Sequence, residues 1–351
     1  MIIYLLVAIS PLIFSYFFPK LHYDKKSKNR FLVICGIVLV LFIGLRSKYV
    51  GSEDSLSYYN HLQHALFADS WNMYYNPNGI EKGFQAFVYI LSRIFDNAQM
   101  LFVATAVIYA GSILYCIYKN SDNVVLSTVM YITLGLMQFQ MQGMRQAIAM
   151  SICIIAFEFA KKHKIIPFAL LLILATTFHR TAIVFAIVFF VALLPYNWIL
   201  LIGLCVVSSL LFVYSAPLMD LANDMFETNY AQTIDSGGFV ATAIHIIIIV
   251  MGMVLHRKAL YNKEDKSQAT VMYVAIISFV CYIMRYFGAG ISERISFYFM
   301  FSQVILLPNS IKNISRDFKP IINIAAYALC ILLFLYRLMG SSFLPYRFFW
   351  N

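Results

Sequence analysis

Arginine, histidine and carboxylate side chains gather in short stretches between long apolar runs of this 351-residue chain. The stretch Met141–Met150 (MQGMRQAIAM) places Arg145 and Gln146 at the start of one such run. A guanidinium at a helix N-terminus suits an anion, because its planar fork and the helix dipole both favour negative charge. The alternative is that Arg145 only anchors a helix end. The composition of the chain, and the side of a membrane on which each stretch lies, bear on this choice.

Four further stretches carry candidate groups. Gly44–Gln63 contains Arg46, Asp54 and Tyr58; Ile80–Phe95 contains Glu81; Thr176–Ala182 contains His179 and Arg180; Met284–Phe301 contains Arg285, Glu293 and Arg294. His179 and Asp54 are candidate bases, since imidazole or carboxylate can accept a proton from a hydroxyl. The arginines, with Gln146, Tyr58, Glu81 and Glu293, are candidate binding groups for an anionic or polar substrate. Simpler alternatives are a solvated helix start for Asp54 and neutralisation of an arginine by Glu293.

The composition indicates a polytopic membrane protein. Hydrophobic residues make up 62% of the chain and charged residues 12%, whereas a soluble domain carries about a quarter charged residues. The net charge is +10, but the basic residues lie in short clusters between apolar runs, which indicates topology and not nucleic-acid binding. The spacing of the six cysteines does not predict a metal site. The sequence contains no nucleotide-binding motif, so no nucleotide cofactor is predicted.

Twelve apolar runs are candidate transmembrane helices, since a span needs roughly 20 residues. They cover residues 2–18, 31–45, 100–118, 124–142, 144–160, 165–178, 181–194, 198–215, 239–255, 269–287, 294–310 and 321–337. The run Gly83–Phe95 is too short, and we predict a re-entrant or interfacial helix there. The predicted fold is an all-α membrane helix bundle. It forms a single transmembrane domain over residues 1–351, with an outer segment at 46–99 and an outer loop at 215–239.

Lysine-rich loops set the predicted orientation by the positive-inside rule. The clusters at 20–30, 161–164, 256–266 and 312–319 all face the cytoplasm if the run Gly83–Phe95 does not cross. All lysines except Lys48 and Lys82 then lie inside, whereas the candidate arginines lie outside. Arginine grips phosphate or carboxylate with two parallel bonds, which lysine cannot do. The sorting therefore favours an outward anion-binding site.

The motifs LRSKYVGSEDSLSYYN, EKGF, MRQAIAM, FHRTA and ERISFYF, in this order from about Leu45 to Phe301, resemble those of EpsG-like, Wzy-type polysaccharide polymerases. The chain has GSED where the family often shows a Gly-Thr-Asp turn, and HRT where His-Lys/Arg-Ser is commoner. The resemblance implies a GT-C-like glycosyltransferase of the bacterial inner membrane with an outward-facing site. Its donor and acceptor would be oligosaccharide repeat units on undecaprenyl pyrophosphate, and its partner a chain-length regulator.

The implied reaction is an inverting, metal-independent glycosyl transfer. Arg46, Arg145 and Arg294 are the first choices for holding the pyrophosphate, followed by Arg285 and Arg180. His179 is the first choice for the base, and Asp54 is the alternative. Competing functions are an O-antigen ligase, an O-acyltransferase built around His179, and a flippase or transporter without enzymatic activity.

Overall fold

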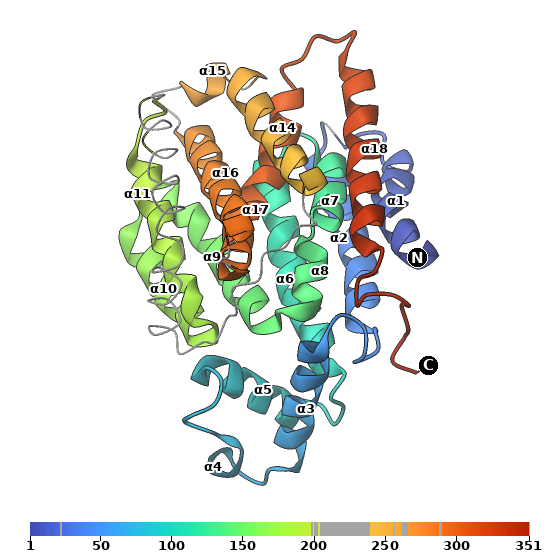
Figure 1. Ribbon diagram of the computed structural model, residues 1–351, viewed down its shortest axis with the longest axis vertical. Helices are drawn as coiled ribbons and strands as arrows, with labels where there is room; N and C mark the ends of the chain where they lie inside the picture. Colours follow the sequence, from blue (N-terminus) through green and yellow to red (C-terminus); the bar gives the residue numbers. More distant parts are fainter. Residues whose placement is uncertain are drawn as a thin grey trace. The chain divides into compact units, whose positions relative to one another are not determined.

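The computed structural model describes residues 1–21, 23–197, 199, 203, 239–255, 257–261, 266–287 and 290–350. Every regular element within these ranges is a helix (Figure 1). From the N-terminus they are α1 (Ile2–Tyr16), α2 (Lys25–Gly44), α3 (Glu53–Phe67), α4 (Trp71–Tyr74), α5 (Lys82–Ile94), α6 (Met100–Asn120), α7 (Val124–Thr133), α8 (Leu136–Gln142) and α9 (Met144–Ala160). There follow α10 (Ile165–Phe178), η1 (Arg180–Ala186), α11 (Ile187–Leu193), α14 (Phe239–Leu255), α15 (Arg257–Leu260), α16 (Ser267–Met284), η2 (Arg285–Phe287), α17 (Gly290–Ile311) and α18 (Lys319–Leu338).

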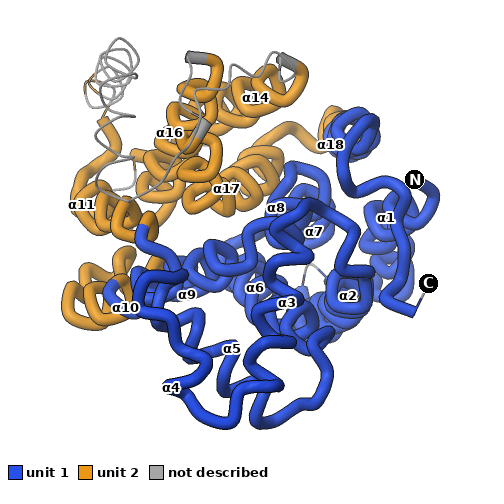
Figure 2. Tube along the Cα trace, turned by 60° about the horizontal axis from the view of Figure 1, so that its bottom comes forward, with its two compact units in different colours: residues 1–155, 173–180, 323–351 blue, residues 156–172, 181–322 orange. Residues whose placement is uncertain are grey.

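The chain divides into two compact units (Figure 2). The first unit comprises Met1–Ile155, Ile173–Arg180 and Asn323–Asn351, and the second comprises Ala156–Leu172 and Thr181–Ile322. The apolar pattern of the sequence carries no sign of this division, because hydrophobic runs of both units look alike.

Most of the described helices overlap the predicted apolar runs. The predicted run 198–215 and the predicted outer loop 215–239 lie outside the described residues. One boundary differs clearly: α2 begins at Lys25, six residues before the predicted run at 31. The reason is the side chain of Asp24, which accepts hydrogen bonds from the backbone N–H groups of Lys26 and Ser27 and so caps the helix.

Length and hydropathy identify the protein as a helical membrane protein. In the described part of the chain, α2, α6, α16 and α18 are each long and apolar enough to cross a membrane. The bent pair α7 and α8 can be counted as a fifth span. Shorter apolar helices such as α10 and α14 have 10–17 residues. The number of twelve crossings therefore remains a prediction.

The predicted span 124–142 is a broken helix. Its halves α7 and α8 meet at an angle of 44°, and Gly135 between them adopts a φ of +102°. The break frees the carbonyl of Leu134, which accepts a hydrogen bond of 2.8 Å from Nη1 of Arg337. A Cβ at position 135 would come within 2.7 Å of the same guanidinium. Such breaks at membrane depth require polar partners of this kind.

Segment 46–99 forms a small layer of helices beyond the ends of α2 and α6 (Figure 1). The helix α5 has 13 residues, about 20 Å at 1.5 Å per residue, which is too short to cross about 30 Å of hydrocarbon. Its buried stripe of Phe84, Val88 and Leu91 recurs at helical spacing and packs against Tyr58 and Leu62 of α3 in one apolar cluster. This amphipathic packing fixes the start of α5, where Glu81 lies.

Candidate functional site

Glu81 is the centre of a polar cluster in the first unit. One carboxylate oxygen, Oε2, accepts a hydrogen bond of 2.5 Å from Nη1 of Arg145. The other, Oε1, lies 3.0 Å from Nδ1 of His179 and accepts from the backbone N–H of Arg180 at 3.2 Å. The side chains of Glu81 and His179 are 10% and 12% exposed, and that of Arg145 is 27% exposed. The cluster is therefore shielded but open on its Arg145 side.

A close helix contact brings Glu81 to His179. Gly83 lies in the first turn of α5 against Thr177 in the last turn of α10. A Cβ added at Gly83 would lie 2.6 Å from the carbonyl oxygen of Thr177 and still closer to its hydroxyl. Phe87 of α5 also packs against Phe178, with ring centres 6.3 Å apart. Only glycine at position 83 permits this approach.

Replacing Gly83 by alanine is expected to push α5 away from α10, because the new methyl group meets backbone atoms that cannot turn aside. Overpacking of this kind costs about 1–3 kcal/mol of folding free energy. It would also lengthen the contact between Glu81 and His179. The thermal unfolding midpoint of the purified variant measures the first effect. Gly111→Ala is the matched control, since a Cβ there meets no atom within 4 Å. Equal midpoints for both variants would contradict the contact.

The electrostatics of Glu81 determine which nitrogen of His179 carries the proton. Burial alone would raise the pKa of Glu81, but the hydrogen bond from His179 and the charge of Arg145 outweigh it and lower the pKa to about 2. The carboxylate is therefore ionised at neutral pH and can only accept. Nδ1 of His179 must donate to it, so the neutral imidazole carries its lone pair on Nε2. Glu81 thus holds His179 in one tautomer, with the lone pair of Nε2 directed away from the carboxylate.

The depressed pKa of Glu81 also predicts a pH dependence of stability. A carboxyl group with a folded pKa of about 2 and an unfolded pKa of 4.5 stabilises the fold fully above pH 4.5, and this contribution is lost as the pH falls towards 2. Between about pH 6 and about pH 3 the free energy of unfolding of the wild type should fall by roughly 2 kcal/mol more than that of Glu81→Gln. Thermal unfolding midpoints of both proteins across this range test the sign. Parallel curves would contradict an ionised, paired Glu81.

Arg145 is held at the start of α9 by two elements of the layer 46–99. Its Nε donates to the hydroxyl of Tyr58 at 3.4 Å, and its Nη1 donates to Glu81. The neighbouring Gln146 is buried. Since Tyr58 and Glu81 fix the guanidinium and part of it stays exposed, Arg145 can present an oriented positive charge to a ligand.

Arg46 has a different environment from the one its residue type suggested. It is 1% exposed, and two of its nitrogens donate at 2.7 Å to the carbonyls of Ile43 and Met141. Its Nε donates to the carbonyl of Val50, and the guanidinium lies 4.2 Å from the ring centre of Phe102. Backbone carbonyls therefore occupy all three nitrogens. This is the geometry of a structural residue, and we leave Arg46 out of the proposed anion site.

Arg46→Lys is expected to lower the free energy of unfolding by about 3 kcal/mol, because one ammonium group cannot reach three buried carbonyls. The measurement is the thermal unfolding midpoint in detergent. Arg180→Lys serves as the control, since Arg180 is exposed. A stable Arg46→Lys protein that loses only activity would return Arg46 to the binding site.

The remaining predicted site residues of the first unit lie at its surface. Asp54 is exposed in the first turn of α3, and Arg180 is exposed next to His179.

Arg285 and Glu293 form a second polar group, in the second unit, and Arg294 follows Glu293 in α17. Nη1 of Arg285 donates to Glu293 at 2.9 Å, and the guanidinium lies 4.2 Å from the ring centre of Tyr282. Arg285 is buried, Glu293 is partly exposed and Arg294 is exposed. Glu293 therefore neutralises Arg285, as the simpler interpretation of the sequence had it.

His61 was not among the residues predicted for the site. It lines an open groove of about 390 Å³ on α3 together with Glu53, Leu56, Ser57, Asn60 and His64. Burial, then the positive charge of Arg145, lowers the pKa of His61. His61 therefore lies within the electrostatic reach of the cluster around Glu81. The polar stripe at helical spacing, opposite the apolar stripe of α3, is the signal that could have found it.

The fold and this cluster define a helical membrane protein with a carboxylate-centred polar site. A family model described as the EpsG family matches residues 29–348, nearly the whole chain. The chain therefore belongs to the EpsG family, which confirms the resemblance found in the five motifs. Membership indicates a role of polysaccharide-polymerase type. No curated protein and no solved structure matches the chain.

Proposed function

We propose that this protein polymerises oligosaccharide repeat units carried on undecaprenyl pyrophosphate, at the outer face of a bacterial inner membrane. The observation that carries the proposal is that the carboxylate of Glu81 accepts hydrogen bonds from both Arg145 and His179. A base and a cation fixed by one carboxylate suit a reaction in which a hydroxyl loses a proton while a phosphate leaves. Family membership and the outward arginine pattern support the substrate class.

In the proposed reaction, Nε2 of His179 takes the proton from a hydroxyl of the acceptor repeat unit. The hydroxyl oxygen attacks the anomeric carbon of the donor chain from the face opposite the pyrophosphate, so the configuration inverts. The bond from this carbon to the pyrophosphate oxygen breaks, and the electron pair leaves with undecaprenyl pyrophosphate. The proton remains on His179 until solvent takes it.

Arg145 acts on the leaving group in this mechanism. Negative charge grows on the bridging oxygen as the bond breaks, and a guanidinium that is already oriented stabilises it without reorganisation. Glu81 and Tyr58 supply that orientation, and the exposed part of Arg145 faces the ligand. Arg180 is a second candidate from the same unit.

A deletion strain complemented with the wild-type gene tests the function on a glycan gel. We expect the deletion to abolish the ladder of long chains while a single repeat unit is still attached to the final acceptor. The wild-type gene should restore the ladder. Loss of every repeat unit from the acceptor would contradict the proposal and indicate a ligase or a flippase.

A further inference from the structure

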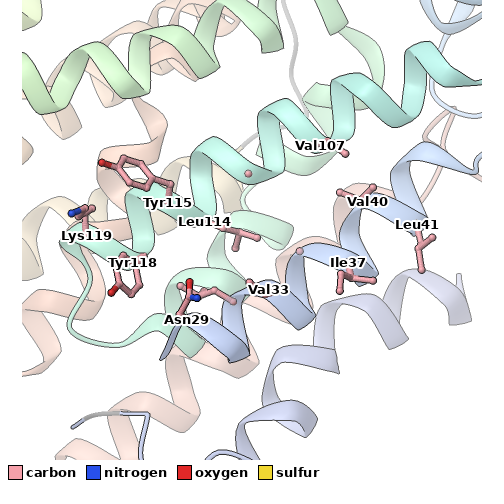
Figure 3. A pocket seen from close by; sticks show the side chains of 13 residues that line it. Asn29, Val33, Ile37, Val40, Leu41, Val107, Leu114, Tyr115, Tyr118 and Lys119 are labelled. Carbon is pink, nitrogen blue, oxygen red and sulfur yellow. The ribbon is translucent and has the colours of Figure 1, made fainter. Parts of the chain in front are cut away.

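An apolar groove runs between α2 and α6 of the first unit (Figure 3). It has a volume of about 660 Å³ and is lined mainly by aliphatic side chains. Val33 and Ile37 of α2 and Val107 of α6 are more than half exposed along it. Gly111 forms part of its wall, and a Cβ added there would meet no atom within 4 Å. The groove is therefore an open depression on the surface of two helices.

We expect this groove to face the hydrocarbon of the membrane. Both helices are long and apolar enough to be membrane spans. The lining of α2 extends from Asn29 to Leu41, about 18 Å at 1.5 Å per residue. Half of the hydrocarbon core is about 15 Å. The groove thus has the length of one tail in one leaflet, and a polyprenyl chain of many isoprene units would extend far beyond it.

One end of the groove is basic. Lys28 donates from Nζ to the carbonyl of Ser121 at 3.0 Å, so its charge is fixed beside Tyr118 at the end of the groove. Lys119 lines the groove itself and is exposed. Asn29 lines the same end and offers an amide that can donate to a phosphate oxygen.

More positive charge lies next to this end. The first turns of α2 contain Lys25, Lys26 and Arg30, all exposed. By the positive-inside rule these turns face the cytoplasm. Basic pockets between membrane helices on that side attract anionic lipid headgroups, at about 1 kcal/mol for each lysine or arginine near the surface.

We propose that the α2–α6 groove binds one anionic membrane phospholipid, with an acyl chain along Val33, Ile37 and Gly111 and its phosphate against Lys119 and Asn29. The apolar length selects a single tail, and the basic end selects a negative headgroup. This binding is independent of the proposed polymerase reaction, because it uses none of the residues around Glu81.

Native mass spectrometry of the purified full-length protein tests the proposal. Phosphatidylglycerol, phosphatidylcholine or undecaprenyl phosphate is added at equal concentration, and the number of molecules retained is counted. Gly111→Leu fills the groove. Lys119→Gln removes a charge at an exposed position and keeps the test available should Gly111→Leu fail to fold. Ile173→Phe adds similar bulk on an exposed apolar face of α10, away from the groove, as the control.

The wild type and Ile173→Phe should each retain one tightly bound phosphatidylglycerol, in preference to phosphatidylcholine. Gly111→Leu should lose it. Lys119→Gln should weaken it by about fivefold, the value of one lysine near a headgroup. Retention by Gly111→Leu equal to that of the wild type would overturn the proposal. So would equal retention of phosphatidylcholine, or displacement of phosphatidylglycerol by undecaprenyl phosphate.

Discussion

Replacing His179 by alanine is expected to lower the rate of chain extension by about 10²–10⁴-fold, the usual contribution of a positioned general base. The acceptor hydroxyl then has no group to take its proton as the new bond forms. The rate is measured with lipid-linked repeat units and purified protein in proteoliposomes, as products longer than one repeat unit per unit time.

His179→Asn separates the base from a structural role. The asparagine amide can still donate to Oε1 of Glu81 from near the position of Nδ1, but it has no counterpart of Nε2. The expected result is a folded protein with an unchanged thermal midpoint and a rate as low as that of His179→Ala. Recovery of activity in His179→Asn would show that His179 only supports the fold.

Glu81→Gln is expected to lower the same rate by about 10²–10⁴-fold, because two groups lose their orientation at once. An amide can turn its NH₂ towards His179, which then presents Nδ1 as the acceptor and Nε2 as the donor. Arg145 loses its partly buried counter-ion. Rates in proteoliposomes measure the effect.

Glu81→Asp is the matched variant for this prediction. It keeps the charge but shortens the side chain, so it should retain more activity than Glu81→Gln. The decisive outcome is which of the two variants extends chains faster. If Glu81→Gln were the more active, the negative charge of Glu81 would have no part in the reaction.

The helices could be predicted from the sequence because hydrophobic runs identify them directly. The broken helix shows the limit of this approach. Gly135 is visible within its run, but its partner Arg337 comes from the far end of the chain, and no local pattern joins the two.

The residues of the polar cluster around Glu81 stand out in the sequence, but their arrangement does not. Arg145, His179 and Glu81 each stood out by residue type and by position next to apolar runs. Their convergence on one carboxylate depends on the contact of Gly83 with Thr177, which lies 94 positions further along the chain. Arg46 shows a second limit, since the sequence cannot distinguish an exposed guanidinium from one bonded to buried carbonyls.

A double-mutant cycle tests most directly whether Glu81 and His179 act as one unit. Rates in proteoliposomes are compared for the wild type, Glu81→Gln, His179→Ala and the protein with both changes. If Glu81 acts by orienting His179, the part of the Glu81→Gln loss that works through His179 vanishes in the double variant, because an absent base cannot be misplaced. The double variant should then be slower than His179→Ala only by the part that works through Arg145, and the two losses should fall well short of multiplying. Rate losses that multiply in the double variant would show that the two residues act independently, and would contradict the proposed site.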